Sequence, residues 1–178
     1  IYHGLALAKL GRTRDGLAEA ERAVELGQQS WHNGPTTFFL VALADLYLEG
    51  GLHDKALETI DQGLARMVNF GGRAYEAELY RLRGAVLRDQ ALTEGDQDAA
   101  ATRAKANLAL EQAISVAEAQ GSLSWHLRAV MELVRLREDE GGGAEERKQL
   151  RALYDRFTEG FDTADLIDAR AMLQTVAA

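Results

Sequence analysis

Residues 40–63 read LVALADLYLEGGLHDKALETIDQG and contain two helical patterns separated by a pair of glycines. In the first pattern the small residue Ala44 stands among bulky apolar residues. In the second, Ala56 and Gly63 occur at helical spacing around Ile60. Small residues allow two helices to approach closely, so that bulky neighbours fill the adjoining grooves. The segment therefore predicts two antiparallel helices joined by a turn at Gly51.

The same pattern recurs along the chain. Gly4, Ala44 and Gly84 stand 40 residues apart, each within a helical pattern. An insertion of about ten residues lies within the third unit, between its two helices, and with that shift Val134 takes the same position in a fourth unit, with Gly141 at its turn. One helix pair cannot bury its apolar face alone, so we expect the units to stack on one another.

This arrangement of small, aromatic and turn residues resembles the tetratricopeptide repeat. The resemblance implies an all-α fold: a tetratricopeptide-like right-handed solenoid of about four helix pairs, with a C-terminal capping helix, in one domain over residues 1–178. The repeats are expected at about 1–30, 35–70, 73–120 and 123–158, with the insertion at 93–105 and the capping helix at 163–176. Individual helices are expected at about 2–10, 13–28, 36–49, 53–69, 73–91, 97–120, 123–139, 144–158 and 163–176.

The composition narrows the range of functions. The chain carries 28 acidic and 20 basic residues, for a net charge of −8, which disfavours general binding to duplex DNA or to anionic membranes. It contains no cysteine, which excludes disulfides and thiolate chemistry and is typical of the cytoplasm. No apolar run approaches the length of a membrane span. Because the chain begins at Ile1 inside a helical pattern, we read it as part of a longer polypeptide.

Recognisable catalytic and metal-binding motifs are not found in the sequence. The four histidines are isolated from one another, so none forms a local metal pair. We therefore expect no enzyme activity, no catalytic residue, no metal and no cofactor. Trp31 and Trp125 are either ligand platforms or aromatic fillers between adjacent helix pairs.

A candidate binding surface follows from the resemblance, since the first helix of each tetratricopeptide unit lines the concave face. Two pairs of arginines, each seven residues apart, share a face of such helices and suggest a basic stripe. An apolar patch lies beside it, and an acidic peptide with a hydrophobic anchor would suit this groove. The candidate residues are Phe38, Val41, Asp45, Arg81, Arg88, Arg128, Met131 and Arg135.

A structural alternative is that these arginines form ordinary helical salt bridges. The acids proposed as their partners are Glu78, Asp89, Glu132 and Glu138.

Beyond the repeat, the segments Glu76–Gly84, Ala113–Gly121, Ser124–Ala129 and Tyr154–Leu166 resemble the C-terminal region of large bacterial signalling ATPases. In that family, of adenylate-cyclase-type or LuxR-type regulators, tetratricopeptide-like repeats follow an ATPase and an output domain. The resemblance implies a cytoplasmic module for protein binding or sensing in signal transduction and transcription regulation. It transfers no functional residue.

The leading hypothesis is therefore a non-catalytic module that binds a protein or peptide, with no direct contact to nucleic acid or membrane. Two alternatives stay open: a small-molecule effector receptor that uses the concave groove, and a structural oligomerisation module. The sequence does not decide between a monomer and a dimer.

Overall fold

The computed structural model describes residues 1–30, 36–70, 72–93 and 96–174, and this part of the chain is helical with no β-strand. The predicted all-α class is confirmed. Trp31 and His32 lie outside the described residues. The elements are α1 (Tyr2–Lys9), α2 (Thr13–Ser30), α3 (Thr36–Glu49), α4 (His53–Phe70), the 3-10 helix η1 (Arg73–Tyr75), α5 (Glu76–Thr93), α6 (Asp96–Ala119), α7 (Leu123–Asp139), α8 (Ala144–Tyr154) and α9 (Ala164–Gln174).

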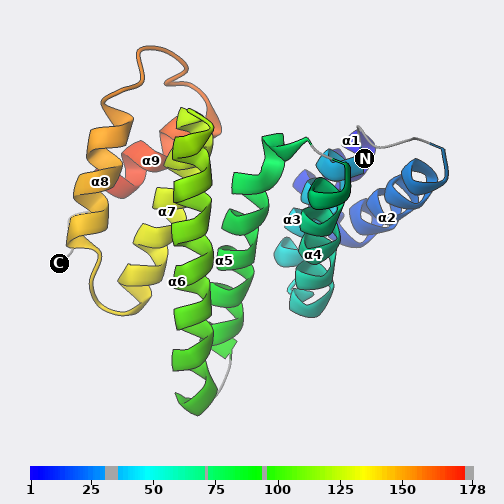
Figure 1. Ribbon diagram of the computed structural model, residues 1–178, viewed down its shortest axis with the longest axis horizontal. Coiled ribbons are helices and arrows are strands. Elements are labelled where there is room, and N and C mark those ends of the chain that lie inside the picture. Colours follow the sequence, from blue (N-terminus) through cyan, green and yellow to red (C-terminus); the bar gives the residue numbers. More distant parts are fainter. Residues whose placement is uncertain (31–35, 71, 94–95, 175–178) are drawn as a thin grey trace.

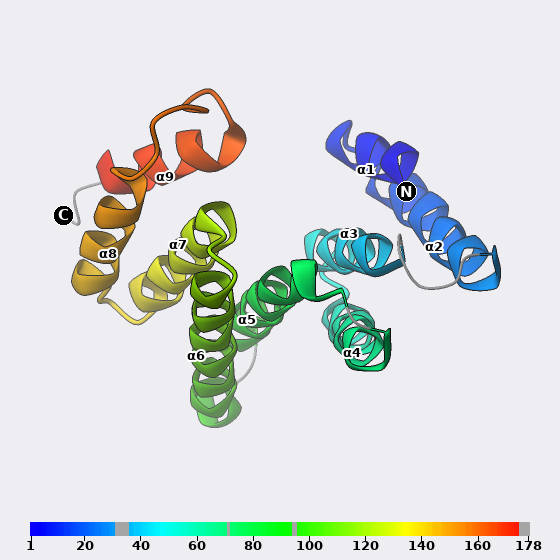
Figure 2. The ribbon, with the colours of Figure 1, turned by 45° about the horizontal axis from the view of Figure 1, so that its top comes forward.

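The helices form two rows that follow the order of the sequence (Figure 1). Each odd-numbered helix contacts the next odd-numbered one, from α1 through α3, α5 and α7 to α9. Figure 2 shows these five helices as an inner arc, with α2, α4, α6 and α8 on its outer side. The inner row therefore presents one continuous surface built from all parts of the chain.

Four of the helix-to-helix turns share one hydrogen-bond pattern. After α3, Gly51 has a φ of 67°, and its N–H donates to the Leu48 carbonyl at 2.9 Å. The next N–H, of Leu52, donates to the Tyr47 carbonyl at 2.8 Å. Only glycine takes this left-handed conformation without a steric cost, which is why the turn begins there. The same pair of bonds ends α1 at Gly11, α6 at Gly121 and α7 at Gly141.

Small residues set the distance between α5 and α6. A Cβ atom added at Gly84 would lie 2.5 Å from Cγ and Cδ2 of Leu110, and 3.3 Å from the carbonyl oxygen of Ala106. Ala106 and Leu110 are themselves fully buried. The close approach that the sequence predicts at this position is therefore present, and Leu110 fills the space that a side chain would need.

The insertion predicted at 93–105 is largely helical. From residue 96 it belongs to α6, which is 24 residues long, while α5 continues to Thr93. Ala91 of α5 and Ala99 of α6 are buried, so the added turns pack against each other. Residues 94–95 lie outside the described part. The insertion thus lengthens one helix pair and leaves the packing around Gly84 intact.

One predicted boundary is wrong by a full turn. Helix α8 ends at Tyr154 rather than at 158, and the bonds that follow it are of the tighter i to i−3 type, from Arg156 to Leu153 and from Phe157 to Tyr154. Phe157 is half-buried and packs against the core formed by α7, α8 and α9. This apolar side chain turns into the core instead of extending the helix, which ends α8 early.

Candidate binding surface

The inner row brings the predicted site residues onto three neighbouring helices. Phe38, Val41 and Asp45 lie on α3, Arg81 and Arg88 on α5, and the other three on α7. Val41 and Met131 are buried in the core, with 8% and 4% of their surface exposed. These two residues support the surface from below, and the expectation that they line it is wrong.

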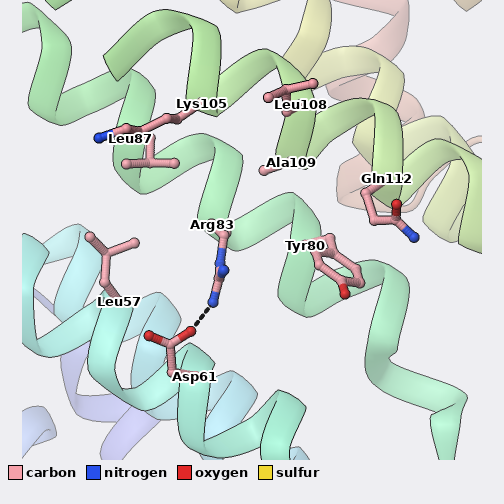
Figure 3. A pocket seen from close by; sticks show the side chains of 9 residues that line it. All are labelled: Leu57, Asp61, Tyr80, Arg83, Leu87, Lys105, Leu108, Ala109 and Gln112. Atoms are coloured by element: carbon pink, nitrogen blue, oxygen red, sulfur yellow. Dashed lines mark hydrogen bonds and ion pairs between the residues drawn. The ribbon is translucent and has the colours of Figure 1, made fainter. Parts of the chain in front are cut away.

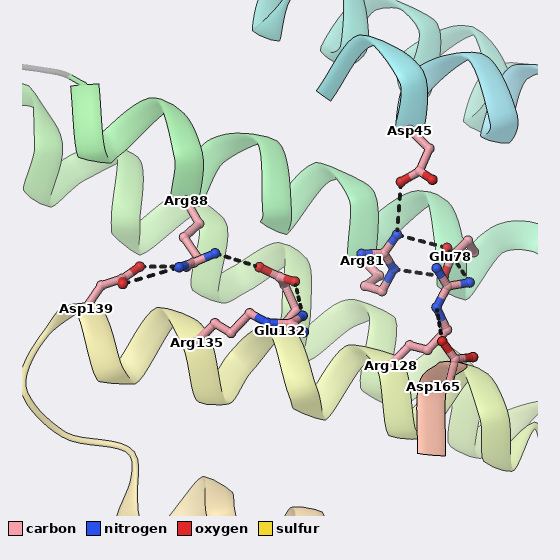
Figure 4. A network of polar contacts seen from close by, with 9 residues as sticks. All are labelled: Asp45, Glu78, Arg81, Arg88, Arg128, Glu132, Arg135, Asp139 and Asp165. Carbon is pink, nitrogen blue, oxygen red and sulfur yellow. Dashed lines mark hydrogen bonds and ion pairs between the residues drawn. The ribbon is translucent and has the colours of Figure 1, made fainter. Parts of the chain in front are cut away.

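Glu78 is the centre of a first group of ion pairs (Figure 4). Its carboxylate accepts two hydrogen bonds from Arg81, both of 2.9 Å, one from Nε and one from Nη2. Oε1 of Glu78 also lies 2.9 Å from Nη1 of Arg128 on α7. The side chain of Glu78 is only 3% exposed, so this carboxylate has lost nearly all its water and depends on the two arginines.

Glu132 is the centre of a second group on the same face (Figure 4). It accepts hydrogen bonds from Arg135 at 2.9 Å and from Arg88 at 3.2 Å. Arg88 also donates from Nε to Asp139 at 2.6 Å. The pairing of Arg88 with two acids of α7 fixes the position of α5 relative to α7.

Two of these arginines, Arg81 and Arg88, are held in their charged form by their partners. Burial lowers the pKa of Arg81 and of Arg88, but the neighbouring carboxylates outweigh it, so both pKa values lie above the ordinary range of arginine. For Arg81 the main carboxylate is Glu78, with further contributions from Asp45 and Glu132. A buried arginine of this kind is a structural cation rather than one offered to a ligand.

The arginines of the predicted basic stripe lie on neighbouring helices, but their charge is balanced within the chain. The four arginines face five carboxylates: Asp45, Glu78, Glu132, Asp139 and Asp165.

The alternative of intramolecular salt bridges holds for Glu78 and Glu132 but not for the other two proposed partners. Asp89 pairs with His53, and Glu138 pairs with Arg147.

Three acids at the edge of these groups retain exposed carboxylates. Asp45 and Asp165 lie 3.7 Å from Arg81 and Arg128, and their side chains are 41% and 46% exposed. No hydrogen bond or ion pair within the described residues reaches Glu49, which is one turn beyond Asp45 on α3. Burial and the nearby charge of Asp45 raise the pKa of Glu49, against a smaller effect of Lys9. The surface therefore carries a local excess of negative charge.

An aromatic row that the sequence analysis missed crosses the inner helices. Tyr2 of α1 contacts Phe38 of α3 with ring centroids 5.6 Å apart, and Phe38 contacts Tyr75 of η1 at 5.8 Å. Tyr75 in turn contacts Trp125 of α7 at 6.4 Å. Tyr2 is 72% exposed, and the other three rings are half-buried. A signal for half of this row was present, since Tyr75 and Trp125 are separated by the same 50 residues as Gly84 and Val134.

The last ring of the aromatic row, Trp125, contacts the guanidinium group of Arg128. The guanidinium carbon of Arg128 lies 5.4 Å from the centroid of the Trp125 ring. Arg128 thus stacks on an aromatic face while it pairs with Glu78 and Asp165. Trp125 also packs against the buried Ala77, Val116 and Ala117, so it fills a gap between helix units while part of its surface stays exposed.

A groove of about 510 Å³ lies on the outer side, where α5 forms the floor between α4 and α6 (Figure 3). Leu57, Leu87 and Leu108 provide apolar walls, and Leu108 is 64% exposed. Arg83 pairs across the groove with Asp61. The volume falls within the range of small-molecule sites in proteins.

The described histidines do not form a metal site. Within the described residues, no group of three or more His, Cys, Asp or Glu side chains is placed to hold a metal ion. His53 pairs with Asp89 at 2.7 Å, and the buried His126 lies 3.6 Å from Glu118. Burial lowers the pKa of His126, Glu118 opposes this effect, and Arg156 adds to it.

None of the helices in the described part of the chain is both long and apolar enough to cross a membrane. Comparisons with protein-family models, with curated proteins and with solved structures find no match to this chain.

Proposed function

We propose that this chain is a tetratricopeptide-like interaction module that binds a protein segment and catalyses no reaction. The finer fold assignment, a right-handed solenoid of four helix pairs capped by α9, belongs to this proposal. It is supported by the repeated turn at Gly11, Gly51 and Gly141, and by the separation of odd and even helices into two rows.

The observation that carries the proposal is the aromatic row from Tyr2 to Trp125. Its ring centroids are spaced by 5.6, 5.8 and 6.4 Å. Two residues of a strand advance by about 6.6 Å. An extended segment laid along the row would therefore place every second side chain on a successive ring.

The wider role is part of the same proposal. We place the module at the C-terminal end of a cytoplasmic bacterial signalling protein, on the basis of the segments Glu76–Gly84 and Tyr154–Leu166 and the absence of cysteine. In such a protein, occupation of the inner surface would report the presence of a partner to the remaining domains. A surface built on packed helices suits this role because little order is lost on binding.

A second candidate is a small-molecule receptor. The observation in its favour is the groove between α4 and α6, because Leu57, Leu87 and Leu108 form apolar walls beside the polar Tyr80 and Lys105. This groove is on the outer side, whereas the sequence suggested the concave side for a small ligand.

An array of extended heptapeptides of varied composition tests the main proposal. We expect a subset to bind, and we expect the row variant Tyr2→Ala, which removes a ring that is 72% exposed, to weaken that binding while it keeps its melting temperature. The matched control is Phe161→Ala, which removes an exposed ring that lies next to Tyr154 and outside the row. Equal binding by the row variant and the control would refute the proposal.

A further inference from the structure

The inner surface combines two features that together recognise arginine. Aromatic faces attract a guanidinium through cation–π contact and stacking, and carboxylates pair with it through charged hydrogen bonds. Arg128 already makes both contacts within the chain, with Trp125 at 5.4 Å and with Glu78 at 2.9 Å. The surface therefore contains one internal example of the recognition that it can offer to a partner.

Two carboxylates beside the aromatic row, those of Asp45 and Asp165, can still pair with a further guanidinium group. Asp45 and Asp165 contact Arg81 and Arg128 only at 3.7 Å, because Glu78 holds both arginines more closely. Their carboxylates stay about half exposed and have room for a shorter contact. Glu49 adds a third acid one turn beyond Asp45, and its pKa is raised first by burial and then by the charge of Asp45, against a smaller effect of Lys9.

The aromatic and acidic features are close enough to act on one segment. Phe38 and Asp45 are seven residues apart on α3 and therefore share a face, separated by about 10 Å along the helix axis. At the other end of the row, Trp125 and Asp165 both contact Arg128. One carboxylate thus lies about two helical turns from the second ring, on the same face of α3, and another lies beside the last ring.

We propose that the partner is an extended protein segment with arginine at alternate positions, stacked along Tyr2, Phe38, Tyr75 and Trp125 and paired with Asp45 and Asp165. This inference rests on the proposed peptide-binding function. It reverses the acidic partner that the sequence suggested, because the arginines on which that expectation depended are neutralised within the fold. Lysine fits the site less well, since its ammonium group is a compact charge that cannot stack on a ring as a planar guanidinium does.

Nucleic acid is a poorer fit than an arginine-containing segment, although bases also stack on aromatic side chains. Its phosphates would face the carboxylates of Asp45, Glu49 and Asp165 on a chain with a net charge of −8. The favourable stacking would be opposed by repulsion of like charges.

Binding of four labelled heptapeptides tests the inference. They carry arginine, lysine, leucine or glutamate at their four odd positions and serine between. We expect the arginine peptide to bind at least about tenfold more tightly than the leucine peptide. The lysine peptide should be intermediate, and the glutamate peptide should not bind.

Two conservative variants supply the residue-level test. Asp45→Asn and Asp165→Asn should each weaken the arginine peptide about three- to tenfold, through loss of one charged contact, and leave the leucine peptide unchanged. The matched control is Asp168→Asn, an exposed acid on α9 three residues from Asp165, which should change neither peptide. Melting curves of the three variants should coincide with that of the wild type.

The possible outcomes separate this inference from the proposed function. If the leucine or glutamate peptide binds as tightly as the arginine peptide and depends on Trp125, the proposed function stands and the preference for arginine is wrong. If the arginine peptide is preferred but the two Asn variants match the control, the assigned carboxylates are wrong. Absence of binding by every heptapeptide, here and in the array, refutes both proposals.

Discussion

Oε1 of Glu78 lies 2.9 Å from Nη1 of Arg128, although the two residues belong to different helices and stand 50 residues apart. This separation equals the length of one unit together with its insertion, so the two residues occupy the same position in consecutive units. An acid in one unit therefore meets a base in the next. The pair joins α5 to α7 and also neutralises the charge that the sequence alone presents as a binding site.

Removal of the Glu78 charge should be strongly destabilising. Glu78→Gln leaves the buried Arg81 without its main counter-charge, and we expect a loss of about 3–5 kcal/mol in the free energy of unfolding. Urea denaturation measures this loss. The control is Glu145→Gln, at a carboxylate that is 79% exposed and pairs with the exposed Lys148, for which the change should stay within about 0.5 kcal/mol. Equal losses in the two variants would show that Glu78 is not a structural centre.

The double variant Arg81→Glu, Arg128→Glu should unfold more readily than the wild type. If these two arginines formed a free surface for a partner, as the sequence alone suggests, their reversal would leave the melting curve unchanged. In the structure the reversal surrounds the buried Glu78 with like charge, so a loss of more than about 3 kcal/mol is expected. Thermal melting followed by circular dichroism decides between the two views.

Gly84→Ala should destabilise the chain, although the same change stabilises an exposed helix. The new Cβ would lie 2.5 Å from two carbon atoms of Leu110, so overpacking should cost about 1–3 kcal/mol. The measurement is the urea midpoint.

A double-mutant cycle with Leu110→Ala provides the check. That single change should cost about 2–5 kcal/mol through the cavity that it creates. In the combined variant the methyl group of residue 84 occupies part of this space, so the two losses should add up to more than the measured loss. Strict additivity would mean that Gly84 and Leu110 do not share one packing site.

Stability should fall in mildly acidic solution because of His126. Its pKa in the folded chain lies below the ordinary value of 6.5, mainly because burial disfavours the charged ring. As the pH falls through 6.5, the unfolded chain therefore takes up a proton that the folded chain does not, and folding is weakened. In His126→Gln this contribution is absent. The difference in unfolding free energy between the two proteins should change between about pH 7.5 and pH 5 and stay constant above that range. Parallel pH profiles would contradict the assignment.

The sequence predicts the helices and the turns between them well because their signals are local and repeated. Gly51, Gly11 and Gly141 mark turns through their backbone conformation, and Gly84 marks a close contact through the side chain that it lacks. Neither signal depends on knowing which distant residue is the neighbour. The end of α8 at Tyr154 does depend on it, since Phe157 leaves the helical pattern to reach the core of the last unit.

The surface is harder to predict because it depends on pairs across units. Arginines seven residues apart define one helix face, but the acids that neutralise them, such as Asp139 for Arg88 and Asp165 for Arg128, lie on other helices. Tyr2, Phe38 and Tyr75 likewise meet only when their helices stack. Tyr75 and Trp125 occupy equivalent positions in consecutive units, 50 residues apart. A comparison of equivalent positions between units could therefore have predicted this part of the aromatic row.

The central claim, that the aromatic row binds an extended segment containing arginine, is tested most directly by the side-chain indole resonance of Trp125 during titration with the alternating arginine heptapeptide. Trp125→Phe identifies the signal. We predict a saturable shift of this resonance, with the same dissociation constant as the labelled peptide gives, and no shift with the glutamate peptide. A Trp125 resonance that stays in place while the arginine peptide binds, or that shifts equally with both peptides, would contradict the account.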